Sequence, residues 1–235
     1  MLDLTPIRAI SLDLDDTLWP VWPTIERAEL ALQDWLREHA PGAASLGQDP
    51  QLRQSIRAAV QKDFSDRAHD LGAMRQESIR RLLIQAGADP ELAAPAYEVF
   101  HEHRQKIVLF DDAMPFLQCI RRHYPLVAIS NGTADVQRVG LSAFFAHGVN
   151  APSLGMAKPA PEIFHHAAHL LGLAPEQVLH IGDDAHLDAW GARNAGMACI
   201  WINRHGKAWP HEGEPPPEVR DLQSLTDWIE HAKSA

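Results

Sequence analysis

Short apolar stretches recur along the chain, and each is followed by a polar turn. The first runs from Ile7 to Leu14 and breaks into Asp15-Asp16-Thr17, the pattern of a buried strand that ends in a turn. Four further stretches predict strands: Leu126 to Ser130, a weaker one at His147 to Asn150, Val178 to Gly182, and Ala198 to Asn203. Helical patterns lie between them, at about Asp112 to Arg122, Asp135 to Phe145, Pro161 to Leu171 and Leu187 to Ala195. Alternating strands and helices predict an α/β fold, a mostly parallel sheet with helices on both faces.

Residues 19–107 interrupt this alternation with helical patterns alone. The patterns cover Thr24 to His39, Gln51 to Phe64, Asp70 to Gln85 and Glu91 to Lys106. The segment is inserted directly after the first strand, near the edge where parallel sheets bind their ligands. We therefore expect two domains: a Rossmann-like core made of residues 1–18 and 108–235, and an inserted α-helical cap made of residues 19–107. A last helix is expected near Leu225 to His231.

The charge balance restricts the partners of this 235-residue chain. It carries 21 Lys and Arg against 31 Asp and Glu, a formal net charge of −10 at pH 7. Nucleic acids and anionic membranes repel such a protein, so neither is an expected partner. A phosphorylated substrate would need a few local cations or a metal ion to hold it against this field.

Cysteine usage and the apolar stretches indicate a cytoplasmic protein. The two cysteines, Cys119 and Cys199, are too few for a disulfide framework or a cysteine-rich zinc site, and we expect both to be buried thiols. No stretch approaches the roughly 18 apolar residues of a membrane span. Met1 to Pro6 lack the basic and apolar regions of a signal peptide.

Acidic sequences follow two of the predicted strands. Asp13 and Asp15 are two residues apart, so a strand would direct both to one face, and the second sequence is Gly182-Asp183-Asp184. Clustered carboxylates repel one another, and removing them from water is costly unless a cation compensates. Magnesium binds one or two carboxylates together with substrate oxygens, and Asp13 and Asp183 supply such a pair. The structural alternative is an acidic turn after one strand and an acidic helix N-terminus after the other.

Two more turns carry groups suited to a phosphate. Ser130-Asn131-Gly132 places a hydroxyl at a strand end, followed by backbone amides that are able to cradle an anion. Lys158 lies in Gly155-Met156-Ala157-Lys158-Pro159, where glycine and proline constrain the loop around a positive charge. Taken alone, a serine in a loop and a solvated surface lysine are the ordinary alternatives.

Taken in order, the four turns resemble the haloacid dehalogenase superfamily of hydrolases, in its helical-cap branch. The chain carries Asp-x-Asp-x-Thr from Asp13, then Ser130-Asn131, then Lys158-Pro159, then Gly-Asp-Asp-x-x-x-Asp ending at Asp188. True dehalogenases of the superfamily lack the second aspartate of the first motif, which is Asp15 here. The resemblance therefore implies phosphoryl transfer to water by a phosphatase.

The resemblance also implies a role for each residue. Asp13, a carboxylate that is ionised at neutral pH, would attack phosphorus and form an aspartyl phosphate. The cofactor Mg²⁺ would be bound by Asp13, Asp183 and the backbone carbonyl of Asp15, and the Asp15 side chain would act as general acid and base. Lys158 would neutralise charge and help catalysis. The phosphate-binding set is Ser130, Asn131, Gly132 and Lys158, and the supporting set is Thr17, Asp184 and Asp188.

A narrower resemblance concerns the substrate. The stretches Asp15 to Trp19, Pro125 to Gly132 and Leu179 to Asp184 are similar to bacterial flavin mononucleotide phosphatases, a group that also dephosphorylates 5-amino-6-(5-phosphoribitylamino)uracil. It implies riboflavin metabolism and a small phosphorylated metabolite as partner. The candidate contacts to the leaving group are Trp19, Arg75 and His186, each with an ordinary alternative in a core or on the surface.

Two other functions fit the same turns. A sugar phosphomutase of the superfamily would return the phosphoryl group from the aspartate to a sugar. A non-catalytic phospho-acceptor, similar to a response-regulator receiver, also uses acidic strand ends and a lysine, but receivers are much shorter and carry no helical insertion. Product analysis separates hydrolase from mutase, and turnover of an aryl phosphate separates both from a receiver. The chain is expected to be a monomer or a homodimer.

Overall fold

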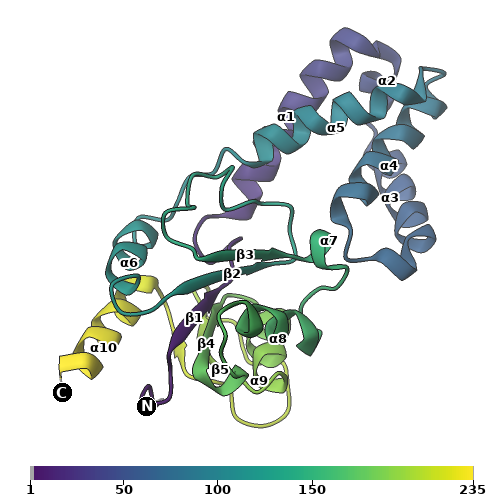
Figure 1. The fold of residues 1–235 in the computed structure, drawn as a ribbon. Coiled ribbons are helices and arrows are strands. Elements are labelled where there is room, and N and C mark those ends of the chain that lie inside the picture. The colour runs from purple at the N-terminus through teal and green to yellow at the C-terminus, as the bar shows by residue number, and fades with distance from the viewer. Residues whose placement is uncertain (1–2, 235) are drawn as a thin grey trace. The chain divides into compact units, whose positions relative to one another are not determined.

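The computed structural model describes residues 3–234, which fall into two compact units (Figure 1). One unit comprises Met1–Pro20 and Val108–Ala235, and the other is Val21–Ile107. The backbone leaves the first unit just after Leu18 and returns just before Phe110, whose amide donates a 2.9 Å hydrogen bond to the Leu18 carbonyl. Both ends of the insertion are therefore fixed at one point of the first unit.

A parallel sheet forms the centre of the first unit. Within the described residues it has six strands in the order β3-β2-β1-β4-β5-β6 (Figure 1). Their bounds are β1 (Ala9–Leu12), β2 (Leu126–Ser130), β3 (His147–Asn150), β4 (Val178–Gly182), β5 (Ala198–Ile202) and β6 (Glu218–Val219). The chain builds β2 and β3 on one side of β1 and then crosses back to place β4 on the other side. Such a switch point is where open parallel sheets bind ligands, beyond the carboxyl ends of the strands.

The central strands form because both of their faces are apolar and covered. Every residue of β1, β2 and β4 is buried. Ala9, Val127 and Ile129 share a core with residues of α8 (Pro161–Leu170) and α9 (Gly191–Asn194). On the other side of the sheet, α6 (Ala113–Ile120) and α10 (Leu222–Ser234) lie together (Figure 1). The predicted α/β fold, a mostly parallel sheet with helices on both faces, is confirmed.

The second unit is helical throughout its regular elements and has a core of its own. Its helices are α1 (Val21–His39), α2 (Pro41–Leu46), α3 (Pro50–Asp63), α4 (Leu71–Gln85) and α5 (Ala93–Arg104). Two of them begin at aspartate caps: Asp49 accepts from the Gln51 amide at 2.8 Å, and Asp70 accepts from the Ala73 amide at 2.9 Å. Across the described residues of both units, every helix is too short or too polar to span a membrane.

The helix predicted from Asp135 to Phe145 is wrong, because this stretch consists of turns. The Asp135 carboxylate accepts from the amides of Gln137 at 2.7 Å and Arg138 at 3.1 Å, as a helix cap does, and the Val139 amide donates to the Asp135 carbonyl at 2.9 Å, so one helix-like turn begins. Gly140 then adopts a φ of 81°, a left-handed conformation that a right-handed helix does not contain. The apolar residues of this stretch are therefore carried by turns, although their spacing resembles that of a helix.

Several short helices and strands were not predicted from the periodic patterns of the sequence. A π-helix, η4 (Ala185–Trp190), replaces the first part of the helix predicted from Leu187 to Ala195, and α9 forms the rest. Elements of two to six residues carry no readable period. The unpredicted elements are α2, α7 (Ala151–Leu154), β6, η1 (Ser65–Arg67), η2 (Pro90–Leu92) and η3 (Pro175–Gln177).

Replacing Asp70 with alanine removes the side-chain acceptor at the start of α4, and we expect a loss of about 1 kcal/mol in the free energy of unfolding of the helical unit. Asp70→Asn is the matched control, because asparagine caps helices as well as aspartate does. Urea unfolding followed by circular dichroism compares the two variants. Equal stability of the alanine and asparagine variants would contradict the capping role.

Candidate active site

A buried lysine joins two carboxylates at the carboxyl edge of the sheet. The Lys158 ammonium donates to Asp13 Oδ1 and to Asp188 Oδ1, each at 2.5 Å. All three side chains are at least nine-tenths buried. Removing three charges from water is costly, and short charge-assisted hydrogen bonds in the interior offset that cost. The sequence predicted these three residues at three separate turns, and the fold brings them together.

Strand register places the first and the last of the four turns side by side. β1 and β4 run parallel with Leu12 opposite Ile181, and the Asp13 amide continues the ladder by donating to the Ile181 carbonyl at 2.9 Å. Asp13 and Asp183 therefore follow neighbouring strands. Thr17 lies between them, with its hydroxyl 3.2 Å from Asp13 Oδ2 and 3.4 Å from Asp183 Oδ1.

Burial and the neighbouring charges together set the protonation states of Lys158 and Asp188. Burial alone would lower the pKa of Lys158, but the charges of Asp13 and Asp188 outweigh it and raise that pKa well above its usual range. Burial likewise opposes ionisation of Asp188, yet Lys158 and the side chain of His180 hold its pKa well below the usual range. The Lys158–Asp188 pair is therefore a stable ion pair.

With Lys158 paired to Asp188, ionising both Asp13 and Asp183 would leave buried negative charge without a full counterion, so ionisation of both is opposed. Burial raises the pKa of Asp13 to about 7, with Lys158 opposing the shift. Burial and the charge of Asp13 raise the pKa of Asp183 to about 8. Carboxylate oxygens of Asp13, Asp183 and Asp188 lie within 4.8 Å of one another. A hard divalent cation fits this all-oxygen set, because it would supply the positive charge that the two raised pKa values indicate is lacking.

The turn after β1 presents Asp15 through a tryptophan. Trp19 is fully buried, and its indole Nε1 donates to Asp15 Oδ1 at 2.8 Å. The Asp16 amide donates to the Trp19 carbonyl at 2.7 Å, and Asp16 adopts a φ of 59°, a left-handed conformation that aspartate tolerates. Trp19 was a candidate contact to the leaving group, with a place in a core as the alternative; its burial fits the alternative, and the ring holds the Asp15 carboxylate.

The turn after β2 secures the lysine loop. The Ser130 hydroxyl is buried and accepts from the Gly132 amide at 3.0 Å. The Asn131 side chain exchanges two hydrogen bonds with the Lys158 backbone, accepting from its amide at 2.7 Å and donating to its carbonyl at 2.8 Å. Asn131 therefore fixes where Lys158 lies, and the predicted contact of its turn to phosphate stays a prediction.

The turn after β4 is held by its own aspartates. Asp184 caps η4 by accepting from the amides of His186 and Leu187, each at 2.8 Å. Asp188 Oδ2 accepts from the Asp184 amide at 3.0 Å, so both Asp188 oxygens have donors. The exposed His186 ring stacks with Trp190 and His211, with centroids 5.0 and 5.1 Å away. Planar side chains thus gather directly after this turn.

Arg75 belongs to the helical unit and is engaged there. Its guanidinium pairs with Glu29 and lies over the Phe100 ring, 4.3 Å from the centroid. These contacts hold α1, α4 and α5 together. They give Arg75 a structural task within its own unit, and its predicted contact to a leaving group stays a prediction.

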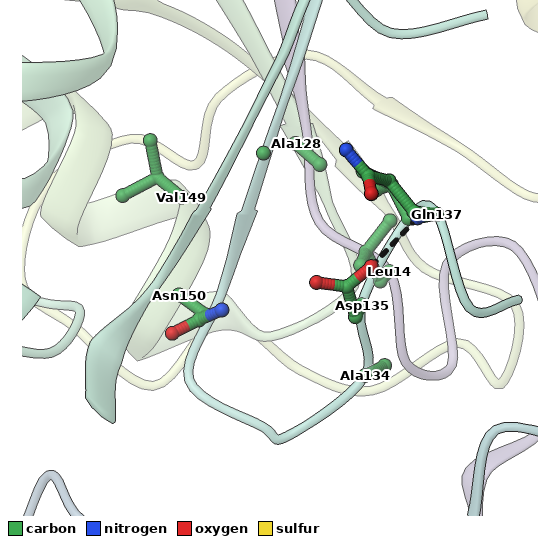
Figure 2. A pocket seen from close by; sticks show the side chains of 9 residues that line it. Leu14, Ala128, Ala134, Asp135, Gln137, Val149 and Asn150 are labelled. Atoms are coloured by element: carbon green, nitrogen blue, oxygen red, sulfur yellow. Dashed lines mark hydrogen bonds between the residues drawn. The ribbon is translucent and has the colours of Figure 1, made fainter. Parts of the chain in front are cut away.

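A pocket of about 110 Å³ lies on the β2–β3 side of the sheet (Figure 2). Figure 2 shows Asp135 and Gln137 at its wall, joined by the 2.7 Å hydrogen bond of the turn that replaces the predicted helix. The predicted site residues are not among those that line it. It is therefore separate from the carboxylate–lysine cluster.

Two residues that support the cluster were not predicted. His180 Nε2 lies 3.2 Å from Asp188 Oδ1, and its Nδ1 lies 2.9 Å from the Ser11 hydroxyl. Because a carboxylate only accepts, the proton sits on Nε2, and Nδ1 accepts from Ser11. Burial lowers the pKa of His180, which keeps the ring neutral. A signal did exist in the sequence: Ser11 and His180 are polar residues inside apolar strands, and they are register partners.

Arg204 and Trp201 also hold the site from outside the four motifs. Arg204 donates to the Thr17 carbonyl at 3.1 Å and forms two bonds to the Asp112 carboxylate. Trp201 Nε1 donates to the Asp183 carbonyl at 2.8 Å. Both residues lie at or just after β5, where an apolar strand pattern gives no hint of contacts to turns elsewhere.

A parallel sheet with acidic turns and a buried lysine at its switch point defines a Rossmann-like α/β protein, a class in which ligands bind at this edge of the sheet. The sequence of residues 7–196, which is most of the chain, matches the haloacid dehalogenase-like hydrolase family. The chain belongs to this family, which confirms the resemblance carried by the four motifs and makes the chain an enzyme of the hydrolase class.

Proteins similar to this chain are named for different reactions and substrates. The 5-amino-6-(5-phospho-D-ribitylamino)uracil phosphatase YigB of Escherichia coli is 30% identical over 95% of this chain and 96% of its own. The phosphoserine phosphatase of Thermus thermophilus is 32% identical over 66% of this chain and 64% of its own. The crystal structure of a 2-haloacid dehalogenase from Pseudomonas syringae superposes with a TM-score of 0.87, at 35% identity over 96% of this chain and 99% of that one.

A methyl group at Gly182 would collide with the site. A Cβ built there lies 2.3 Å from Asp188 Cγ, so Gly182→Ala must displace the carboxylate that holds Lys158. We expect a loss of about 1–3 kcal/mol in the free energy of unfolding, the usual cost of overpacking. Thermal and urea unfolding measure it. Gly42→Ala is the control for a general glycine effect, since its Cβ would make only ordinary contacts, at 3.6 Å or more, and its φ, like that of Gly182, lies outside the left-handed region. A Gly182→Ala variant as stable as wild type would disprove the close approach.

Proposed function

We propose that this chain is a Mg²⁺-dependent phosphomonoester hydrolase that acts on a small phosphorylated metabolite through a phosphorylated aspartate. The observation that carries the proposal is the buried contact of Lys158 with Asp13 and Asp188, beside the Asp183 carboxylate. A nucleophile, a cation and a metal-binding oxygen set then meet at one edge of the sheet. Relatives named as phosphatases support the same reaction class.

Asp13 and Asp183 are the residues that would hold the metal, together with the Asp15 backbone carbonyl that the family resemblance implies. Asp188 is a weaker candidate, because its two oxygens already accept from Lys158 and from the Asp184 amide. When bound, Mg²⁺ supplies positive charge that offsets the repulsion between the carboxylates and a phosphate dianion.

Asp13 is the proposed nucleophile. Its two oxygens are oriented by Lys158 at 2.5 Å and by Thr17 at 3.2 Å, so little reorganisation precedes attack. A bond forms between an Asp13 oxygen and phosphorus as the bond to the leaving oxygen breaks. Asp15, held by Trp19 Nε1, donates its proton to that oxygen. Asp15 then takes a proton from water, which attacks the aspartyl phosphate and releases inorganic phosphate.

The phosphoryl oxygens would be held by the side chains of Lys158 and Ser130 and by the amides after Ser130. The Lys158 ammonium would then donate hydrogen bonds to Asp13, to Asp188 and to a phosphoryl oxygen. Its positive charge would offset the negative charge that develops in the transition state. Asn131 keeps the lysine loop at this place through two backbone hydrogen bonds. Val21–Ile107 would act as the cap that excludes water and selects the leaving group.

Flavin mononucleotide or 5-amino-6-(5-phosphoribitylamino)uracil is the proposed substrate. Both have a planar ring system in the leaving group. The stacked rings of His186, Trp190 and His211 follow the Asp183-Asp184 turn and offer planar surfaces of matching chemistry. The relative from Escherichia coli, named for the second of these substrates, supports the choice. The free, buried thiols of Cys119 and Cys199 are consistent with the cytoplasm as the place of this reaction.

Dehalogenation is the second candidate, favoured by the 2-haloacid dehalogenase structure at 35% identity. Asp15 argues against it, because carbon–halogen cleavage releases a halide that needs no protonation by a general acid. The Trp19 hydrogen bond fixes the orientation of the Asp15 side chain, and a positioned carboxyl group is what protonation of an oxygen leaving group requires.

We expect inorganic phosphate release in the presence of Mg²⁺, highest in kcat/KM for flavin mononucleotide and the ribitylaminouracil phosphate within a panel of nucleotides and sugar phosphates. Asp13→Asn should lower kcat by about 10³-fold or more, because the nucleophile is lost. Phosphate release measured by a colorimetric assay gives both results.

Each rival function has its own outcome in that panel. An isomeric sugar phosphate without free phosphate would indicate a mutase, halide release from a 2-haloacid would indicate a dehalogenase, and no turnover of any substrate would indicate a phospho-acceptor. Full activity of Asp13→Asn would refute the nucleophile assignment.

Mg²⁺ should stabilise the folded enzyme through Asp183. At a concentration of about 100 Kd, a ligand specific for the folded state contributes about 2.7 kcal/mol, and we expect a matching rise in melting temperature. Asp183→Asn should abolish the rise. Asp184→Asn is the matched neighbour, since asparagine preserves the helix cap, and should retain it. Loss of the Mg²⁺ effect in both variants, or in neither, would contradict the assignment.

A further inference from the structure

The helices α6 and α10 lie side by side (Figure 1), and a second cluster of metal-ligating side chains joins them. It consists of Cys119 on α6, His123 in the turn that follows, and Glu230 on α10. One ligand atom from each lies within 4.8 Å of the others, and the Cys119 thiol donates to Glu230 Oε1 at 2.9 Å. Nothing in the proposed reaction uses these groups.

Helix packing assembles the cluster before any ligand arrives. After α6 ends, the amides of His123 and Tyr124 both donate to the Ile120 carbonyl at 3.0 Å, and this tight turn brings a His123 ring nitrogen within 4.8 Å of the Cys119 sulfur. On α10, the fully buried Ile229 anchors the helix next to Glu230. Binding of an ion would therefore require little additional ordering of the backbone that carries these three residues.

The donor chemistry differs from that of the Asp13–Asp183 pair. A thiolate, an imidazole and a carboxylate form a borderline-soft set that selects Zn²⁺ or similar transition metals over Mg²⁺, which prefers oxygen ligands. Three protein ligands leave one position of a tetrahedron for water. Cys119 is buried while His123 and Glu230 are exposed, so the open position would face solvent.

From this geometry we propose that Cys119, His123 and Glu230 bind a Zn²⁺-type divalent ion that joins α10 to α6. On binding, the Cys119 thiol loses its proton to solvent, and the sulfur–metal bond replaces the thiol–carboxylate hydrogen bond. Arg122, whose guanidinium is 3.5 Å from Glu230 Oε1 with both side chains more than half exposed, is a weak competitor for that carboxylate. The ion would stabilise the C-terminal helix and leave the catalytic edge unchanged.

Co²⁺ is the probe, used on the whole chain with a large excess of Mg²⁺ to occupy the catalytic carboxylates. We expect a near-ultraviolet thiolate-to-Co²⁺ charge-transfer band that saturates at one ion per chain and is displaced by Zn²⁺. Cys119→Ser should abolish the band. His123→Gln and Glu230→Gln alter exposed positions and should weaken Co²⁺ binding by about tenfold or more, since even outer partners of metal ligands cost about 10–100-fold.

Asp183→Asn is the matched control, because it removes the catalytic metal carboxylate and should leave the Co²⁺ band unchanged. In the same excess of Mg²⁺, Zn²⁺ should also raise the melting temperature of wild type and of Asp183→Asn, and it should raise that of Glu230→Gln less. A band that persists in Cys119→Ser, or the absence of any band in folded wild type, would overturn the proposal. Phosphate release plays no part in this readout, so the site and the proposed function can fail independently.

Discussion

A lysine held between two buried carboxylates is the interaction on which the rest of this site depends. Dehydrating each ion costs several kcal/mol, so Lys158, Asp13 and Asp188 are tolerable in the interior only with close, well-aligned partners. The surroundings supply that alignment. Asn131 fixes the Lys158 backbone, His180 and the Asp184 amide complete the bonds to Asp188, and Gly182 leaves room for that carboxylate. The support comes from elements far apart in sequence, which explains why the site needs the whole sheet.

The sequence predicted the residues that come together because their chemistry is conspicuous and their strands are regular. Asp13, Ser130 and Asp183 each follow an apolar stretch, and parallel strands end at a common edge. Once β1 lies between β2 and β4, those residues must converge. The position of Lys158 had a weaker basis, since a lysine in a loop is ordinarily solvated. Its burial depends on Asn131, whose side-chain amide makes two hydrogen bonds to the Lys158 backbone, as a neighbouring strand would.

What escaped prediction was decided by side-chain geometry that leaves no periodic trace. Trp19 was expected to meet a substrate, and it instead holds Asp15 from a fully buried position. The helix expected after Asp135 stops after one capped turn, because Gly140 takes a left-handed conformation. Ser11 and His180 were passed over as strand residues, although a polar pair in register across two apolar strands is a sign of a supporting network.

The hydrogen bond between the Phe110 amide and the Leu18 carbonyl closes the neck of the helical insertion within the sheet-bearing unit. For that unit, the 91 residues between Leu18 and Phe110, positions 19–109, act as one long loop whose two ends are already joined at its base. Its content is then free to vary in evolution, lengthening, shrinking or exchanging helices, while the catalytic edge keeps its register. One scaffold with an interchangeable insert is a physical route by which close sequence relatives come to carry different substrate names.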